Sequence, residues 1–263
     1  MLVVKIGGAA GINYDNFLSD LAKQNKFLLV HGGKEELRIL SENLGKPAKW
    51  VTSATGFVSR YTDKETMEMF KMAYCGKMNK MIVEKLQSFG VNAVGLSGID
   101  GQIAMAKRKP SIKIVENGKV KILHDDYTGK IEKINTNLLE LLLNSGFTPV
   151  VTPPALSYEY ESLNVDGDRF ASMLAQSFKS DTLIMFSNVA GLYKDFNDST
   201  TLIKTIKKDG LESFMQFAQG TMKKKLMGAK EALDGGVKKI IIASANVENP
   251  ISSALAGNGT VIE

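Results

Sequence analysis

The sequence has few of the residues that build disulfide frameworks and metal centres. Its 263 residues include one cysteine, Cys75, and two histidines, His31 and His124, which stand far apart. A single cysteine excludes an intrachain disulfide, and two distant histidines lack the spacing of metal ligands. We therefore expect no metal site built from protein side chains, and we interpret both histidines as structural residues at a strand end or a hairpin.

Long apolar runs and long runs of one charge are also absent. No apolar stretch approaches the ~20 residues that span a bilayer, and Lys5 falls where the apolar part of a secretory signal would lie. The net charge is +5, from 33 lysines and arginines against 28 acidic residues. We expect a cytoplasmic protein. Its mildly basic surface either serves solubility or attracts an acidic protein or an anionic small molecule.

Two common nucleotide-binding signatures are missing as well. The sequence contains no G-x-x-x-x-G-K-[ST] segment, which excludes a P-loop enzyme. The glycines of Gly95–Gly101 depart from the G-x-G-x-x-G pattern, so there is no Rossmann fingerprint.

Apolar, β-branched runs alternate with helical patterns from end to end. The apolar run Leu2–Ile6, which includes Lys5, predicts a buried strand, and the continuous apolar run Phe27–His31 predicts a strand that is buried on both faces. This alternation predicts an α/β fold, a three-layer αβα sandwich around a mostly parallel sheet. Further strands are expected over 92–96, 148–151, 182–186 and 239–243, and helices over 17–21, 37–44, 63–74, 78–89, 138–144, 167–178 and 222–234.

Residues 102–134 interrupt the alternation. Short strands are expected over 103–107, 112–115 and 119–123, and Asn117-Gly118 is a strong hairpin signal. A second short strand pair is expected around Tyr158 and Leu163. A β-hairpin inserted into a chain of this class is a candidate lid over a substrate.

Glycine and lysine follow the first two predicted strands. Lys5-Ile6-Gly7-Gly8 ends the first strand, and His31-Gly32-Gly33-Lys34 leads from the second strand into a helix. The carboxyl ends of parallel strands lie at one edge of a sheet, where ligands bind. Glycines let the backbone approach an anion, and a helix N-terminus attracts it. Each segment alone is also compatible with an ordinary turn.

Three later segments carry charged or amide side chains at element ends. Arg60 precedes a helix, with Thr62 as its expected N-cap, and could bind a carboxylate through two hydrogen bonds. Asn164 and Asp168 flank the start of another helix. Lys225 lies in the first turn of a helix, where it opposes the helix dipole, so an anionic ligand explains its position better than helix stability does.

Together, and in this order, the five segments resemble the motifs of the amino-acid kinase family over essentially the whole chain. The segments 127–135 and 163–165 are similar to its N-acetylglutamate kinase branch. Ser59-Arg60-Tyr61-Thr62-Asp63 resembles the lysine-biosynthesis group, which acts on 2-aminoadipate or glutamate held by its α-amino group on a small acidic carrier protein. The resemblance implies ATP-dependent phosphorylation of a side-chain carboxylate. Free N-acetylglutamate as the acceptor, or a non-catalytic amino-acid or nucleotide sensor, remains an alternative.

The resemblance also implies roles for individual residues. Lys5 and Lys225 would contact the transferring phosphoryl group, and Asp168 would orient both lysines. Mg²⁺ would be held by the phosphates of ATP rather than by a protein cage. The residues implied for the acceptor site are Gly33, Lys34, Arg60 and Asn164. Those implied for phosphate and nucleotide binding are Gly7, Gly8, Gly32, Ser187, Asn188, Gly191, Leu192, Tyr193 and Met222.

The sequence departs from the family pattern at three points. Lys34 stands where the family has a third glycine, Ser187-Asn188 replaces Thr-Asp, and Thr221 replaces a glycine before Met222. A basic group near the acceptor side would attract an acidic carrier. Its members are Lys46, Lys49, Lys107, Arg108, Lys109 and Lys113.

The resemblance implies an acceptor lobe over 1–162 and a nucleotide lobe over 163–263. Because the sequence begins at its first strand, we expect no N-terminal helix of the kind that links arginine-inhibited relatives into hexamers. We expect a homodimer formed through helices of the N-terminal half.

Overall fold

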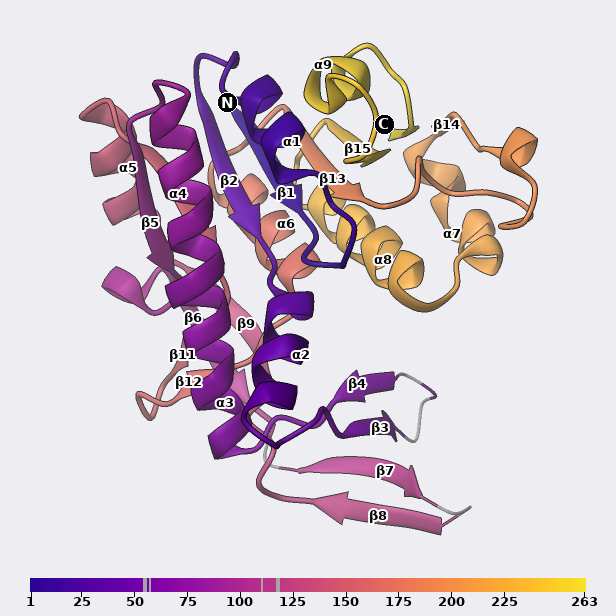
Figure 1. The fold of residues 1–263 in the computed structure, drawn as a ribbon. Coiled ribbons are helices and arrows are strands. Elements are labelled where there is room, and N and C mark those ends of the chain that lie inside the picture. The colour runs from indigo at the N-terminus through magenta and orange to yellow at the C-terminus, as the bar shows by residue number, and fades with distance from the viewer. Residues whose placement is uncertain (54–55, 57, 110, 117–118) are drawn as a thin grey trace.

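A computed structural model describes residues 1–53, 56, 58–109, 111–116 and 119–263. Its main element is an eight-stranded sheet in the upper part of the molecule (Figure 1). The strands follow the order β14-β16-β15-β13-β1-β2-β10-β5. Their bounds are Leu2–Ile6 (β1), Phe27–His31 (β2), Ala93–Ser97 (β5), Thr148–Thr152 (β10), Thr182–Ser187 (β13), Thr205–Ile206 (β14), Lys239–Ser244 (β15) and Thr260–Ile262 (β16).

The pairing of these strands brings distant segments of the chain to one edge. Neighbouring strands are parallel except for β15 and β16. In the centre, Ile6 stands beside His31 on one side and beside Phe186 on the other. The carboxyl ends of β1, β2 and β13 therefore lie side by side, as the sequence predicted for a parallel sheet.

Helices cover both faces of this sheet and complete the predicted three layers (Figure 1). Two separate apolar clusters form, one against each face. Phe17 and Phe186 meet edge to face in one of them, with ring centroids 5.0 Å apart. The helices of that face are α1 (Tyr14–Leu21), α4 (Asn79–Ser88) and α9 (Pro250–Leu255), and those of the other are α5 (Asn137–Asn144), α6 (Gly167–Ser177) and α8 (Gly220–Asp234).

Two smaller sheets occupy the lower part of the molecule. The first has the order β12-β11-β6-β9 and contains the strand pair expected around Tyr158 and Leu163. The second has the order β4-β3-β7-β8. Their bounds are Trp50–Ser53 (β3), Val58–Arg60 (β4), Ala104–Arg108 (β6), Ile112–Glu116 (β7), Lys119–Leu123 (β8), Gly129–Ile134 (β9), Ala155–Ser157 (β11) and Ser162–Leu163 (β12).

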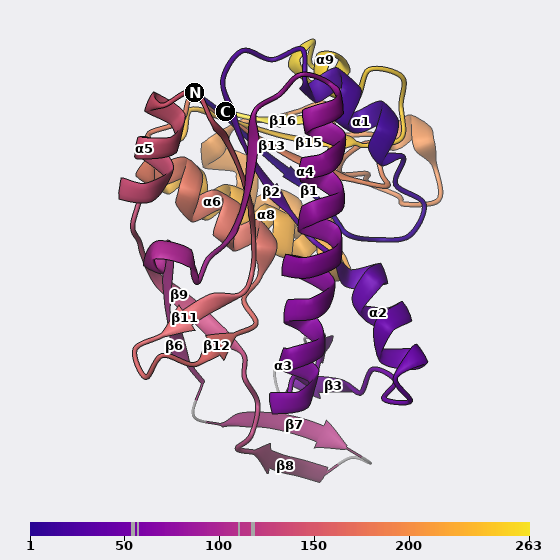
Figure 2. The same ribbon diagram turned by 60° about the vertical axis from the view of Figure 1, so that its left-hand side comes forward.

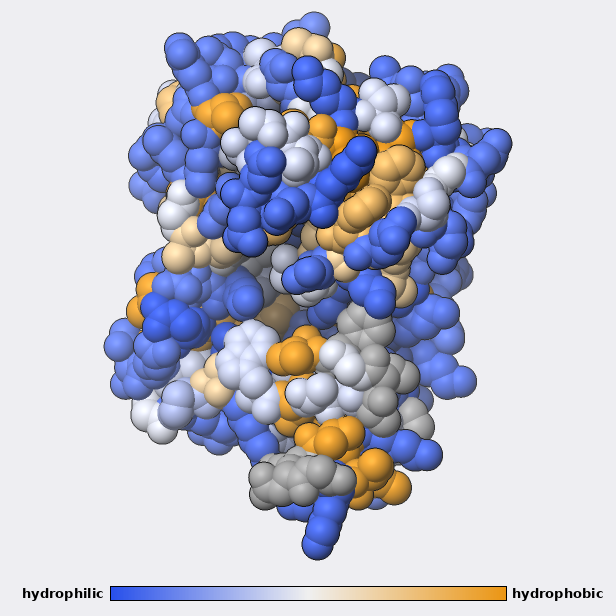
Figure 3. Space-filling view, turned by 90° about the vertical axis from the view of Figure 1, so that its right-hand side faces the viewer, coloured by the Kyte–Doolittle hydropathy of each residue, from blue (hydrophilic) through white to orange (hydrophobic). Residues whose placement is uncertain are grey.

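The predicted hairpin is present as β7 and β8, which pair antiparallel. The Asn117-Gly118 signal at its turn lies outside the described residues. The hairpin does not stand alone, because β7 also pairs with β3, and β3 with β4. The space-filling view from the right of Figure 1 shows a hollow at mid-height, between the eight-stranded sheet above and this small sheet below (Figure 3).

The prediction of two separate helices over 63–74 and 78–89 was wrong. Helix α3 (Lys64–Lys71) continues through a π-helical segment, Met72–Met78, directly into α4. Figure 2 shows the three as one long rod. Gly76, which lies between the two predicted helices, is inside this segment with helical neighbours on both sides.

The predicted N-cap of α3 was wrong by one residue. Asp63, not Thr62, caps the helix, and its side chain accepts a hydrogen bond from the Thr66 amide at 2.8 Å. Thr62 is fully buried instead, and its amide donates to Asp126 Oδ2 at 3.1 Å. The sequence also gave no sign of α7 (Leu211–Phe214), α9 or the strands β14 and β16, whereas α2 (Lys34–Asn43) matches its prediction. No helix of the described chain has the length and apolarity needed to span a membrane.

Candidate active site

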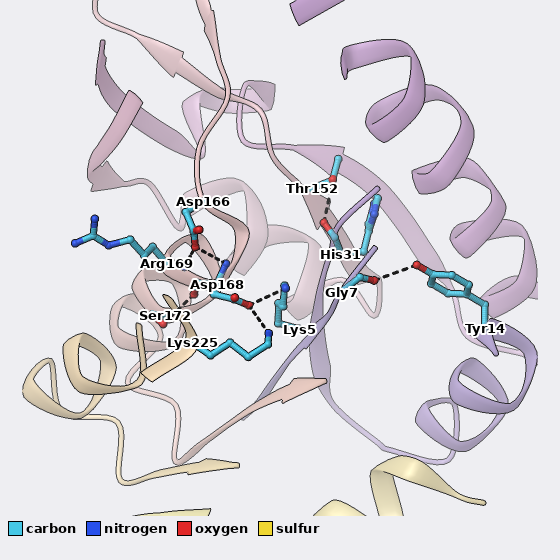
Figure 4. A network of polar contacts seen from close by, with 10 residues as sticks. All are labelled: Lys5, Gly7, Tyr14, His31, Thr152, Asp166, Asp168, Arg169, Ser172 and Lys225. Carbon is cyan, nitrogen blue, oxygen red and sulfur yellow. Dashed lines mark hydrogen bonds and ion pairs between the residues drawn. The ribbon is translucent and has the colours of Figure 1, made fainter. Parts of the chain in front are cut away.

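Two lysine ammonium groups meet at one carboxylate oxygen at the carboxyl edge of the large sheet (Figure 4). Lys5 comes from β1, and its Nζ lies 2.7 Å from Asp168 Oδ1. Lys225 comes from α8, and its Nζ lies 3.0 Å from the same oxygen. Asp168 is in the first turn of α6. The structure thus brings together the three residues for which the sequence implied catalytic roles.

Burial and mutual attraction set the charges of this group. Burial disfavours the charged form of Asp168, but Lys225 and Lys5 outweigh it and hold the pKa of the carboxyl far below its ordinary range. Burial lowers the pKa of Lys225 to about 8, although Asp168 opposes the change. Two cations share one anion, so the group carries excess positive charge that an incoming phosphate can neutralise.

The helices that carry Asp168 and Lys225 are held together beside the site. Arg169 of α6 forms a two-point ion pair with Glu231 of α8, with Nε 2.9 Å from Oε2. The helices also pack closely, because a Cβ on Gly228 would lie 3.1 Å from Ser172 Oγ. These contacts fix the position of one helix against the other.

Asp166 begins α6 as its N-cap. Its Oδ1 accepts hydrogen bonds from the amides of Asp168 and Arg169, each at 3.0 Å (Figure 4). Its carboxylate therefore orients the helix and, through the helix, the Asp168 side chain.

The glycine-rich loops after β1 and β2 touch through their backbones. A Cβ on Gly8 would lie 2.3 Å from the Gly33 nitrogen, so no larger residue fits there without a backbone shift. The Glu35 amide donates to the Gly8 carbonyl at 2.8 Å and locks the contact. Close approach of the two loops therefore requires glycine at position 8, which is a local structural reason for this part of the sequence motif.

Two of the implied phosphate donors are already engaged. The Gly7 amide donates to the Phe186 carbonyl at 3.2 Å, and the Gly32 amide donates to the Ile6 carbonyl at 3.0 Å. Both bonds continue the pairing of the central strands. Strand pairing therefore occupies these two amides in this structure, and a role of Gly7, Gly8 and Gly32 in phosphate binding stays a prediction.

Arg60 lies on β4 and is buried, with 8% of its surface exposed. Within the described part of the chain, its Nη1 contacts Ser41 Oγ at 3.5 Å, and no Asp or Glu forms an ion pair with it. Burial lowers the pKa of Arg60. A buried guanidinium without a carboxylate partner is costly, and a bound carboxylate would remove that cost.

Asn164 stands beside the Arg60 segment. Its side-chain amide donates to Thr62 Oγ1 at 3.0 Å, and Thr62 Oγ1 in turn donates to the Arg60 carbonyl at 3.2 Å. The Tyr127 amide donates to the Thr62 carbonyl at 2.7 Å. Arg60 and Asn164, two of the implied acceptor residues, are 104 positions apart in the chain. The structure places both on one hydrogen-bonded network.

Lys34 is exposed at the start of α2, where its Nζ lies 5.2 Å from the centroid of the Trp50 ring. The Arg60 guanidinium lies 5.6 Å from the same centroid. Trp50 was absent from the predicted site residues, although it is the single tryptophan of the chain. Its position between two cations depends on the pairing of β3 with β4, which the sequence did not reveal.

Four of the residues implied for nucleotide binding lie at the end of β13 and in the loop that follows it. Ser187 ends β13 at the catalytic edge, and the Asn188 side chain donates to the Ala10 carbonyl at 2.8 Å. Gly191 and Leu192 serve local structure. A Cβ on Gly191 would lie 2.3 Å from Thr260 Oγ1, and the buried Leu192 donates its amide to that oxygen.

The other two residues implied for nucleotide binding are Tyr193, directly after Leu192, and Met222 of α8. Tyr193 forms a bridge with Leu202, and its ring meets Phe196 edge to face. Met222 lies in the first turn of α8 and packs partly buried against the core.

His31 is the structural strand-end residue that the sequence predicted. It is fully buried, its Nδ1 lies 2.9 Å from the Gly32 carbonyl oxygen, and its Nε2 lies 3.0 Å from Asn79 Nδ2. Burial lowers the pKa of His31 to about 4, so the ring is neutral. His124 is exposed on the hairpin side. Among the described residues, no group of three or more His, Cys, Asp or Glu side chains could hold a metal ion.

The fold and this site define a class of phosphoryl-transfer protein, and comparison with known sequences agrees. The chain belongs to the amino acid kinase family, which its residues 1–244 match. It is 53% identical to a Deinococcus radiodurans protein named LysW-aminoadipate kinase, over all of this chain and 91% of that one. It is 50% identical to the Thermus thermophilus protein of the same name over the whole of both chains.

Solved structures agree on the fold. The carbamate kinase from Giardia lamblia bound to AMP-PNP superposes with a TM-score of 0.71 at 15% identity, covering 99% of this chain and 97% of that one. At this identity the likeness concerns the fold alone.

Proposed function

We propose that this protein is an ATP-dependent kinase that phosphorylates the side-chain carboxylate of 2-aminoadipate, or of glutamate, held through its α-amino group on a small acidic carrier protein. The product would be an acyl phosphate of lysine or arginine biosynthesis. The observation that carries the proposal is the convergence of Lys5 and Lys225 on Asp168 Oδ1. The names and whole-length identity of the two bacterial relatives support the choice of acceptor.

The chemistry requires charge stabilisation rather than proton transfer. A carboxylate oxygen of the acceptor attacks the γ-phosphorus of ATP, the new O–P bond forms, and the bond to the β–γ bridging oxygen breaks to release ADP. The carboxylate is already a nucleophile, so no general base is needed. Lys5 would neutralise the transferring phosphoryl group, and Lys225 would neutralise charge between the β- and γ-phosphates. Mg²⁺ bound to the phosphates would supply further neutralisation.

The division of labour follows the two sides of the site. Residues 1–162 contribute Arg60 and Lys34, which would hold the acceptor. Residues 163–263 contribute Asp168, Lys225 and the loop after β13, which would hold the nucleotide. Asn164 stands at the boundary and, through Thr62, lies next to Arg60.

An acidic carrier would meet the small lower sheet. The cross-strand register places Val58, Val115, Val120 and Ile122 on the same face as Arg60, and each of these four apolar side chains is at least 42% exposed. This exposed face is contiguous with the acceptor side and lies in the lower part of Figure 3, where apolar side chains gather.

The basic group predicted for carrier binding is smaller than the sequence suggested. Lys46 pairs with Asp63, and Arg108 pairs with Glu161 while stacking on Tyr127. Lys49 lies over the ring of Tyr61. The exposed lysines of this group for which no ion pair is found within the described part of the chain are Lys49, Lys107, Lys109 and Lys113, and the last three also lack a ring contact there.

The direct test compares acceptors. Purified protein would be given ATP with free N-acetylglutamate, with carrier-linked 2-aminoadipate and with carrier-linked glutamate, and acyl phosphate would be trapped with hydroxylamine. We expect turnover of the carrier-linked compounds. Turnover of free N-acetylglutamate alone would instead assign the chain to N-acetylglutamate phosphorylation, and no turnover of any carboxylate would refute the kinase proposal.

A further inference from the structure

Tyr14, the first residue of α1, reaches back to the glycine loop after β1. Its hydroxyl donates a hydrogen bond to the Gly7 carbonyl oxygen at 3.0 Å (Figure 4). The turn between them includes Gly11, whose φ of 80° lies in the left-handed region that favours glycine. The Tyr14 ring packs at the edge of the apolar cluster that α1 covers. Phenylalanine would pack in the same way, so packing explains the ring and leaves the hydroxyl to be explained.

The hydrogen bond fixes the orientation of the peptide group between Gly7 and Gly8. This peptide is trans and planar, so the Gly7 carbonyl and the Gly8 amide N–H point in opposite directions. The carbonyl points toward Tyr14 and α1, which lie on one face of the large sheet. The Gly8 amide is therefore turned away from that face.

The opposite face carries the charged group of the site. It is covered by α6 and α8, which supply Asp168 and Lys225, and Lys5 reaches Asp168 from β1. Figure 4 shows Tyr14 on one side of Gly7 and the three charged side chains on the other. An amide turned away from Tyr14 at this point is turned toward the charged group.

The Gly8 amide is also available to a ligand. Among the described residues no hydrogen bond donated by it is found, whereas the Gly8 carbonyl accepts from the Glu35 amide at 2.8 Å. The amides of Gly7 and Gly32 are both engaged in strand pairing. A hydroxyl that donates to a peptide carbonyl polarises the peptide and makes its N–H a stronger donor. Tyr14 therefore orients and strengthens the amide that strand pairing leaves free.

We propose that Tyr14 is a positioning residue for phosphoryl transfer, which acts through the Gly7–Gly8 peptide to hold the Gly8 amide toward the transferring phosphoryl group. The inference rests on the proposed kinase function, and it adds a residue that acts on the substrates through the backbone. The amide would donate to an oxygen of the phosphoryl group. A donor that is already in place stabilises the transition state without reorganising during the reaction.

The test is Tyr14→Phe, which keeps the ring and removes the hydroxyl. Loss of a whole transition-state donor lowers kcat by about 10²–10³-fold, whereas here the donor stays and loses its support, so we expect kcat to fall about tenfold. The KM values for ATP and for the carrier-linked acceptor should stay within about twofold, as expected of a contact that acts in the transition state.

A transition-state analogue gives a second readout. Calorimetry would measure the binding of ADP and Mg²⁺ with aluminium fluoride, which takes the place of the transferring phosphoryl group, in the presence of the carrier-linked acceptor. We expect Tyr14→Phe to weaken this complex by the same factor by which kcat falls. Binding of ADP and Mg²⁺ without the fluoride should be unchanged.

Asn13→Ala is the matched control. Asn13 caps the same helix, and its side chain accepts from the Asn16 amide at 3.1 Å. Its removal weakens the start of α1 and leaves the hydrogen bond between Tyr14 and Gly7 in place. We expect a lowered melting temperature, followed by circular dichroism, with kcat within about twofold of the wild type.

Three results would overturn the inference. These are a wild-type kcat in Tyr14→Phe, an equal fall of kcat in Asn13→Ala, which would trace the loss to the helix start, or equal weakening of ADP binding with and without aluminium fluoride. Failure of the proposed function looks different, because the wild type itself would then phosphorylate no carboxylate acceptor.

Discussion

At the residue scale, the site is organised around a single oxygen atom. Asp168 Oδ1 lies within 3.0 Å of the Nζ atoms of both Lys5 and Lys225, and all three side chains are nearly buried. Removing Asp168 would leave two buried cations facing each other, so its carboxylate is needed for the fold as well as for orientation. Each lysine, in contrast, can be removed while the other keeps its partner.

We predict that Lys5→Ala and Lys225→Ala each lower kcat by about 10²–10³-fold, as expected when one stabilising contact to transition-state charge is lost. Steady-state kinetics and circular dichroism would separate this loss from misfolding. Lys230→Ala is the control, since Lys230 lies on the same helix but is exposed and paired with Glu212. A wild-type kcat in either lysine variant would remove that residue from the mechanism.

The lowered pKa of Lys225 predicts an alkaline limit to nucleotide capture. The amine is charged below its pKa of about 8 and neutral above it, so kcat/KM for ATP should fall as the pH rises through this value. The corresponding fall of kcat with rising pH should be smaller, because bound phosphates favour the charged form of the Lys225 amine. The Lys225→Arg variant should show no such fall of kcat/KM for ATP with rising pH, since arginine stays charged.

The lowered pKa of Lys225 affects stability in the opposite direction to activity. Between about 8 and the ordinary 10.5, the unfolded chain binds this proton and the folded chain does not. Through this group, the free energy of unfolding rises with pH. Loss of activity in that range should therefore occur without unfolding, and a profile that follows the melting curve would contradict the assignment to Lys225.

At the element scale, the central strands and the β7–β8 hairpin were predictable, whereas β3, β4 and the sheet that they form with the hairpin were not. β2 is a continuous apolar run up to His31, and β1 is an apolar run broken by Lys5 alone, so both patterns indicate buried strands. β3 and β4 have four and three residues, and their pairing depends on β7, about 60 positions further along the chain. The π-helical segment Met72–Met78 was not predicted, because a helical apolar pattern does not distinguish a π turn from an α turn. Engagement of the Gly7 and Gly32 amides depends on strand register, which a motif alone cannot specify.

The contact between the two glycine loops gives a paired prediction. Gly8→Ala places a methyl group against backbone atoms of the Gly32–Lys34 loop, and we expect it to destabilise the fold by about 1–3 kcal/mol and to impair turnover. Gly76→Ala meets no atom within 4 Å inside a helical rod. We expect it to stabilise the fold by about 0.5–1 kcal/mol. Urea unfolding measures both, and equal effects would contradict the close-approach argument.

At the scale of the whole molecule, the exposed lysines of the hairpin side give the acceptor side positive charge. Lys107, Lys109 and Lys113 lie on the hairpin side, and we predict that reversing all three to Glu raises the KM for a carrier-linked acceptor about tenfold and weakens its salt dependence. The rate with a small free acceptor should not change. The control reverses three exposed lysines that precede strands at the opposite edge: Lys26, Lys179 and Lys238.

We also predict a homodimer formed through helices of the N-terminal half. The rod of α3 and α4 exposes apolar side chains, with Met72 57% and Phe89 41% accessible. Light scattering should give roughly twice the 28.7 kDa of one chain. Met72→Glu should shift the mass toward one chain, and a hexamer would refute this assembly.

The two-point ion pair between Arg169 and Glu231 has a mechanical consequence. It joins α6 to α8, so Asp168 and Lys225 travel together whenever the nucleotide side of the molecule shifts. Lys5 belongs to β1 and is not part of that rigid pair of helices. Because α6 also packs against β1, which carries Lys5, the three charged groups form one body at the edge of the large sheet, and any closing of the hollow would have to bring the lower sheet toward them.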